Sequence, residues 1–172
     1  MFQVGDYVMY KTEGVCKVDQ ITMIENNSKE KRKKLYYVMI PVKDAGLKIY
    51  SAVENTAIPR RPIMTEQEAR TMIESMGELP TLQIENEKNR EEIYKKALKS
   101  CDCREWVRVI KTIYLRKKGR LSEGKKSTAV DDYYQKAAQE LLLGELSVSM
   151  NLSEEEAERY IREHIKPSCD QE

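Results

Sequence analysis

One group of basic residues has the type and spacing to bind phosphate. We interpret the stretch from Arg116 to Lys126 as a turn between two helices, rich in cationic side chains. Cations beside the free backbone N–H groups of a helix N-terminus can bind phosphates independently of base sequence. Lys88 and Arg90 extend this surface on the preceding helix. The expected phosphate ligands are therefore Lys88, Arg90, Lys117, Lys118, Arg120, Lys125 and Lys126. A merely solvated helix face is the alternative.

Residues suited to catalysis or metal binding are scarce. His164 is the only histidine, and Cys16, Cys101, Cys103 and Cys169 provide a single close pair, so no tetrahedral zinc set is completed. Glycine-rich nucleotide loops are also absent from the sequence. We therefore expect no enzyme, no metal, no cofactor and no small-molecule substrate.

The net charge of +1 conceals an uneven distribution along the chain. Residues 85–126 hold 14 Lys and Arg against 7 Asp and Glu, whereas residues 127–172 hold 4 against 11. This asymmetry favours a surface that faces a polyanion, backed by an acidic surface. No apolar run approaches the roughly 20 residues of a membrane span, and the N-terminal residues do not resemble a signal peptide. We expect a cytoplasmic protein without membrane contact.

The first sixty residues show the alternation and turn signals of a small, bent β-sheet or barrel. The expected strands are residues 4–10, 15–24, 35–42 and 47–53. Pro41 predicts an edge or a bulge, and hence an exposed side, in the third strand. We interpret the basic run 29–34 as a hairpin tip rather than a nucleic-acid contact, and residues 59–62 as a linker, since Pro59 and Pro62 suit neither a helix interior nor a central strand.

From Thr65 onward the apolar residues recur with a helical period. Capping boxes at Thr65 and Ser153 start the first and last helices, and Gly77 is expected at the end of the first. The other helices are expected near residues 86–100, 102–117 and 127–148. Their core stripes include Trp106 and Tyr114, then Tyr133. The prediction is a two-domain α+β protein, with a β domain at 1–60 and an all-α domain of about five helices at 63–172.

Two separate motifs resemble the CarD/CdnL family. The opening FQVGDYVMY, followed by EGV, resembles the start of that family and the polymerase-interacting module of transcription-repair coupling factors. The stretches 119–126 and 142–146 are similar to the family's helical domain. The resemblance implies a Tudor-like barrel that binds the RNA polymerase β subunit through a strand edge. It also implies a helical domain that contacts promoter DNA upstream of the melted region.

The resemblance assigns the polymerase contact to Lys48, Ile49 and Tyr50. Some members carry an arginine where this chain has Tyr50, so the contact is expected to be more apolar here or to meet a divergent partner surface. Many members place a wedge tryptophan where this chain has Glu87. The lone Trp106 falls in the following helix, where we expect core packing rather than insertion into DNA. The sequence thus predicts a bacterial transcription regulator, with a polymerase-bound adaptor that lacks direct DNA contact as the alternative.

Overall fold

The computed structural model describes residues 1–25 and 33–165. The chain divides into two compact units, Met1–Ile63 and Met64–Glu172, here named the β unit and the helical unit. Most of the basic run 29–34, and Cys169, lie outside the described residues. None of the described helices is long and apolar enough to cross a membrane.

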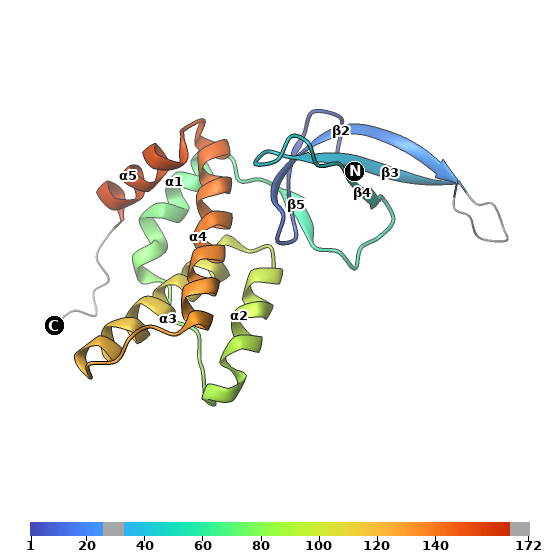
Figure 1. Ribbon diagram of the computed structural model, residues 1–172. Helices are drawn as coiled ribbons and strands as arrows, with labels where there is room; N and C mark the ends of the chain where they lie inside the picture. Colours follow the sequence, from blue (N-terminus) through green and yellow to red (C-terminus); the bar gives the residue numbers. More distant parts are fainter. Residues whose placement is uncertain (26–32, 166–172) are drawn as a thin grey trace. The chain divides into compact units, whose positions relative to one another are not determined.

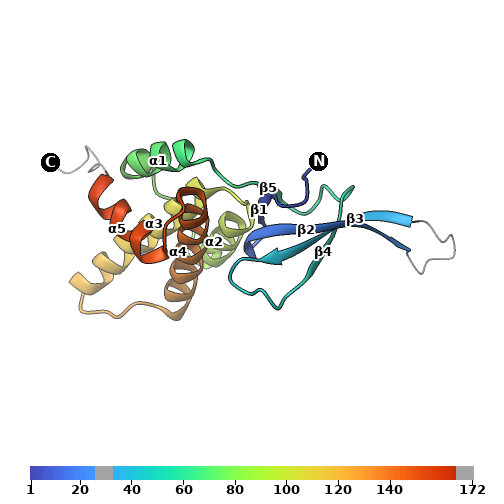
Figure 2. The same cartoon turned by 90° about the horizontal axis from the view of Figure 1, so that it is seen from above.

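The described part of the β unit is an antiparallel sheet with the strand order β4-β3-β2-β1-β5. β2 and β3 lie side by side as a long hairpin (Figure 1, Figure 2). The four expected strands are confirmed with shifted ends. The strands are β1 (Tyr7–Tyr10), β2 (Gly14–Glu25), β3 (Lys33–Pro41), β4 (Ile49–Ala52) and β5 (Arg60–Pro62).

Two expectations about the sheet are wrong. The presumed linker contains β5, which pairs with β1 through Met9 and Arg61. Pro62 fits there because β5 is an edge strand, where a missing N–H costs no ladder bond. β3 is an interior strand rather than an edge, and Pro41 fits because it lies past β4, which pairs with β3 only as far as Met39.

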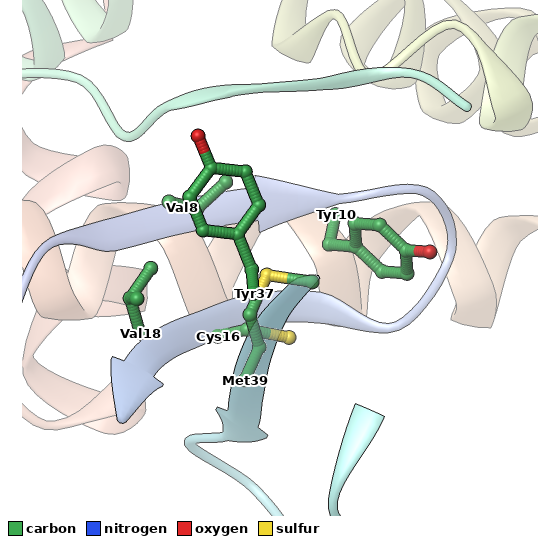
Figure 3. Close-up of a cluster of buried hydrophobic side chains, with 6 residues drawn as sticks. All are labelled: Val8, Tyr10, Cys16, Val18, Tyr37 and Met39. Atoms are coloured by element: carbon green, nitrogen blue, oxygen red, sulfur yellow. The ribbon is translucent and has the colours of Figure 1, made fainter. Parts of the chain in front are cut away.

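An apolar cluster on one face of the sheet forms a main part of the core of the β unit (Figure 3), and Met9, Val15 and Val38 are buried as well. Alternation along β3, and along β2 as far as Val18, puts every second side chain on this face, and a register shift between Val18 and Gln20 then brings Ile21 to the same face. Burying side chains of this size stabilises a fold by roughly 1.5–3 kcal/mol each. The cluster consists of Val8, Tyr10, Cys16, Val18, Tyr37 and Met39, with partly buried neighbours that include Phe2 and Ile21.

In the described part of the helical unit, α4 packs against each of the other four α-helices. Figure 1 shows α4 running through this unit. The predicted α+β class is therefore confirmed. The elements are α1 (Glu66–Ser75), two short 3₁₀ helices (Met76–Glu78 and Glu87–Asn89), α2 (Arg90–Lys99), α3 (Cys103–Ser122), α4 (Ala129–Met150) and α5 (Glu154–His164).

The helix starts follow the predicted caps. Thr65 and Ser153 both form capping boxes with the glutamate three residues on. Asp102 and Thr128 cap α3 and α4 through their side chains. These bonds satisfy N–H groups that have no partner within the helix.

The expected end of α3 is wrong. The helix continues through Gly119, because an isolated glycine costs only about 1 kcal/mol against alanine in a helix. Gly124, with φ of +72°, ends it. There the N–H of Lys125 bonds the carbonyl of Arg120 and the N–H of Gly124 bonds that of Leu121, which is a Schellman motif. Lys117, Lys118 and Arg120 therefore lie on the helix and not in a turn.

The core of the helical unit holds Trp106, which is fully buried. Its indole N–H donates to the carbonyl of Leu98 over 3.3 Å, which joins α3 to α2. The expected core role of Trp106 is confirmed. Tyr114 and Tyr133 were expected in the core stripes but are 58% and 66% exposed, because helical periodicity does not show how wide a stripe the neighbouring helices cover.

Candidate functional site

Two features of the described residues are suited to binding macromolecules. The first is the free edge of β4. On one side β4 pairs with β3 from Ile49 to Ala52. On the other side no strand pairs with it in the described part of the sheet. Unpaired N–H and C=O groups on such an edge can accept an additional strand.

Arg60 secures the C-terminal end of β4 from the opposite edge strand. Its guanidinium donates to the Ser51 hydroxyl over 3.0 Å and to the Ala52 carbonyl over 3.2 Å. It also donates to the carbonyl of Val53 and lies 5.5 Å from the centre of the Tyr37 ring. The carbonyls at this end of the edge are thus occupied, whereas those near Tyr50 have no such partner among the described residues.

The orientation of β4 turns the backbone of Tyr50 outward. The N–H of Val53 bonds the carbonyl of Leu35 over 2.9 Å. Bonded pairs alternate along an antiparallel ladder, so Ser51 and Ile49 direct their backbone groups toward β3 and Tyr50 directs its own away. The Tyr50 side chain is 55% exposed, while Ser51 is buried.

The residues predicted to contact polymerase therefore lie together. Ile49 and Tyr50 belong to β4, and the exposed Lys48 directly precedes it. Leu47 and Val42, in the loop that connects β3 to β4, are also exposed. This surface combines these apolar side chains with charged ones, because Lys43, Asp44 and Lys48 are all exposed in the same loop.

The second feature is the cationic end of the helical unit. We use this name for the 3₁₀ helix Glu87–Asn89, the C-terminal half of α3, the 123–128 connection and the first turn of α4. A network of ion pairs around Asp131 assembles it. Asp131 is fully buried and lies 3.2 Å from Arg90 Nε and 3.1 Å from Arg116 Nε.

Glu87 completes this network. One of its carboxylate oxygens pairs with Arg116 and the other with Arg90. These hydrogen bonds, above all the one from Arg116, hold the pKa of Glu87 below its usual range. The network joins α2, α3 and α4, so Lys88 lies at the same end of the unit as the α3 cations. Its two arginines are engaged with carboxylates and are poorly exposed.

The other predicted phosphate ligands differ in how free they are. Lys117 pairs with Asp132, and Lys125 pairs with Glu123. Arg120 donates to the carbonyl of Lys126 over 2.9 Å. Three exposed lysines, by contrast, have no ion-pair partner among the described residues. They are Lys88, Lys118 and Lys126.

The first turn of α4 is not an open anion site. It carries Asp131 and Asp132, and the Thr128 hydroxyl accepts the N–H of Asp131 over 3.2 Å. Carboxylates already offset the helix dipole at this end. Lysine side chains, rather than backbone N–H groups of α4, are therefore available to a phosphate.

Sequence reasoning missed Arg60, Asp131 and Asp132. Arg60 was placed in a linker, and the two aspartates were taken as part of an acidic segment. The local signal for Asp131 was available, because it falls three residues after a threonine cap, but its pairing with Arg90 of α2 and Arg116 of α3 depends on the packing of the helices. Within the described ranges, no group of three His, Cys, Asp or Glu side chains is placed to hold a metal ion.

Comparison with protein families gives one match. Residues 2–63 match the family described as the CarD-like/TRCF RID domain. The match covers the β unit and stops before α1. A search of curated proteins found no match to the chain.

Proposed function

Because residues 2–63 form a CarD-like/TRCF RID domain, from a family of RNA polymerase-interacting domains, we propose that this protein is a bacterial transcription regulator. The β unit binds the polymerase β subunit, and the helical unit contacts promoter DNA through phosphates. The protein acts in the cytoplasm, where polymerase is found, and catalyses no reaction.

The free edge of β4 is the observation that carries the polymerase half of this proposal. Strand addition takes its affinity from main-chain hydrogen bonds and its specificity from alternate side chains. The outward N–H and C=O of Tyr50 supply the main-chain bonds. The exposed Tyr50 ring and the neighbouring Lys48 and Ile49 supply the side-chain contacts.

The polymerase half is tested by two substitutions at one position. Tyr50→Pro removes the outward N–H, and an edge strand tolerates the change. We expect affinity for polymerase core enzyme to fall about tenfold, as losing one or two hydrogen bonds implies. Tyr50→Thr keeps the N–H and is expected to stay within about threefold. Equal losses in both variants would contradict main-chain pairing.

The DNA half rests on the lysines of the cationic end. Lys118 and Lys126 are exposed, and the Asp131 network fixes the helices that carry them. Point charges of this kind bind the backbone of any duplex, with a strong dependence on salt. Glu87 stands where many CarD/CdnL members have a wedge tryptophan and is bound to Arg116 and Arg90, so phosphate contact without a wedge is proposed.

The salt dependence of DNA affinity tests this half. Lys118→Met together with Lys126→Met should reduce the slope of log affinity against log salt by about 1.8, since each lost phosphate contact removes about 0.9. Lys136→Met is the matched control, because Lys136 is highly exposed on α4 outside the cationic end. An unchanged slope in the double variant would count against DNA contact here.

A polymerase-bound adaptor is the second candidate function. Tyr114 and Leu121 are 58% and 75% exposed on α3, and exposed apolar side chains of this size favour a protein partner. In that case Tyr114→Ser with Leu121→Ser would leave DNA affinity unchanged and abolish capture of a second protein by the polymerase complex.

A further inference from the structure

Two adjacent carboxylates at the start of α4 lie in different surroundings. Asp131 is fully buried between two arginines, where it holds three helices together. The side chain of Asp132 is 53% exposed and faces Lys117 of α3. Asp131 therefore holds the cationic end together from inside, whereas Asp132 lies at its surface.

Asp132 is held in place by two partners. Its Oδ1 lies 2.6 Å from Lys117 Nζ, and its Oδ2 accepts the Ser127 hydroxyl over 2.9 Å. The Lys117 bond, followed by the Ser127 bond, lowers the pKa of Asp132 from its ordinary value. Asp132 is therefore ionised throughout the neutral range.

Lys117 is correspondingly restrained. Its Nζ also donates to the side-chain oxygen of Gln135, and its side chain is only 28% exposed. Two of the three N–H groups of its ammonium are thus engaged, and the carboxylate of Asp132 neutralises its charge, so Lys117 is less available to a phosphate than an unpaired lysine. The next residue, Lys118, is exposed and has no ion-pair partner among the described residues.

We propose that Asp132 limits the DNA affinity of the helical unit by acting as an internal counter-ion for Lys117. The carboxylate of Asp132 and a phosphate compete for the charge of the same ammonium group, so Lys117 contributes less to DNA affinity while Asp132 is paired with it. This inference rests on the proposed DNA contact and names the residue that tunes its strength.

The ion pair between Lys125 and Glu123 is a weaker device of the same kind. Both of its side chains are about 60% exposed, so solvent screens the pair and the lysine exchanges partners readily. Asp132 has a second bond from Ser127, and Lys117 has a second bond to Gln135. The larger effect is therefore expected at Asp132.

The test measures binding of the full chain to a labelled 30-base-pair duplex of arbitrary sequence, over a series of salt concentrations. Asp132→Asn keeps the shape of the side chain and removes its charge. If Lys117 gains one phosphate contact, the salt slope steepens by about 0.9, and affinity at about 0.1 M salt rises on the order of tenfold.

Two controls separate this mechanism from a general loss of negative charge. Glu140→Gln removes one charge from α4 about two turns further along and should change affinity less than twofold, with an unchanged slope. In a Lys117→Met background, Asp132→Asn should have no further effect, because the lysine that it releases is absent. Thermal melting of each variant verifies that it is folded.

The outcomes distinguish this inference from the function on which it rests. A wild-type chain with no salt-dependent DNA binding would overturn both. If the wild type binds DNA, an unchanged affinity in Asp132→Asn would overturn the inference alone. An equal gain in Glu140→Gln, or a gain that persists without Lys117, would do the same.

Discussion

The β unit and the helical unit form their candidate binding surfaces by different means. The β unit has an apolar core, and its candidate surface is the main chain of β4. The helical unit buries a carboxylate, Asp131, between Arg90 and Arg116, and its candidate surface consists of lysine side chains. A surface made of backbone groups tolerates changes of side chain. A surface made of lysine side chains depends on each lysine and on each carboxylate that pairs with one.

If the β4 edge binds polymerase as proposed, this difference would let Tyr50 replace the arginine that some CarD/CdnL members have at this position. The outward N–H and C=O of a strand edge do not depend on the side chain. At the cationic end, by contrast, the exchange of one aspartate for asparagine is expected to change affinity. The following experiments test the contrast, from the largest expected effect to the smallest.

Loss of Asp131 should have the largest effect. Asp131→Ala leaves two arginines facing each other without their buried partner, which costs about 3–5 kcal/mol of unfolding free energy. Asp132→Ala, at the exposed neighbour, should cost much less, because solvent screens its ion pair with Lys117. Denaturant unfolding of both variants measures this. Similar losses at the two positions would show that burial does not distinguish the two carboxylates.

Loss of Arg60 tests whether one side chain secures the edge of the β unit. Arg60→Met removes the hydrogen bonds to Ser51, Ala52 and Val53, at a cost of about 2 kcal/mol. Amide exchange within β4 should accelerate. Arg61→Met is the control, because the guanidinium of Arg61 bonds an exposed carbonyl of Pro62. If amide exchange within β4 is unchanged in Arg60→Met, Arg60 does not stabilise the edge.

Alkaline pH should weaken both units through groups that are buried in their neutral form. Burial, the larger cause in each case, raises the pKa of Cys16 from 9.0 and that of Tyr94 from 10.0, both to about 12. The unfolded chain releases these protons first. Stability is therefore complete below about pH 9 and falls as the pH rises toward 12, by up to about 1.4 kcal/mol per pH unit for each group.

Substitutions at the two sites measure this alkaline loss. Cys16→Ala should flatten the pH dependence of the unfolding free energy in the β unit, and Tyr94→Phe should flatten it in the helical unit. Both are followed by thermal melting between pH 8 and pH 11. If neither substitution changes the dependence of the unfolding free energy on pH, other groups such as the lysines cause the loss of stability at alkaline pH.

Two glycines near the cationic end should respond in opposite directions. Gly124→Ala forces a side chain into positive φ and should cost about 1 kcal/mol. Gly119→Ala, in the interior of α3 with no atom within 4 Å of the added Cβ, should stabilise by up to about 1 kcal/mol. The midpoints of denaturant unfolding show whether each variant is stabilised or destabilised. A stabilising Gly124→Ala would contradict the Schellman motif at the end of α3.

Local features of both units could be predicted from the sequence. Alternation located four strands, and the threonine and serine caps located the starts of α1 and α5. The end of α3 was expected near residue 117, because sequence alone does not show that Gly124, rather than Gly119, takes positive φ. Tyr114 and Tyr133 fit a core stripe by period alone, but the helices that pack around them leave both exposed.

Contacts between distant residues could not be predicted in the same way. β5 escaped notice because Pro59, just before it, and Pro62, at its end, suggest a linker, and only pairing with β1 makes it a strand. Arg90 and Lys117 were counted as phosphate ligands, yet their carboxylate partners come from α4. A charge pattern along the chain does not show which cations the fold neutralises internally.

One set of affinities tests most directly whether the two units serve different partners. Tyr50→Pro and the double variant Lys118→Met with Lys126→Met are each titrated with polymerase core enzyme and with duplex DNA. We predict that the first loses polymerase affinity about tenfold and keeps DNA affinity, and that the second does the reverse. Loss of both affinities in either variant would contradict the separate roles of the two units.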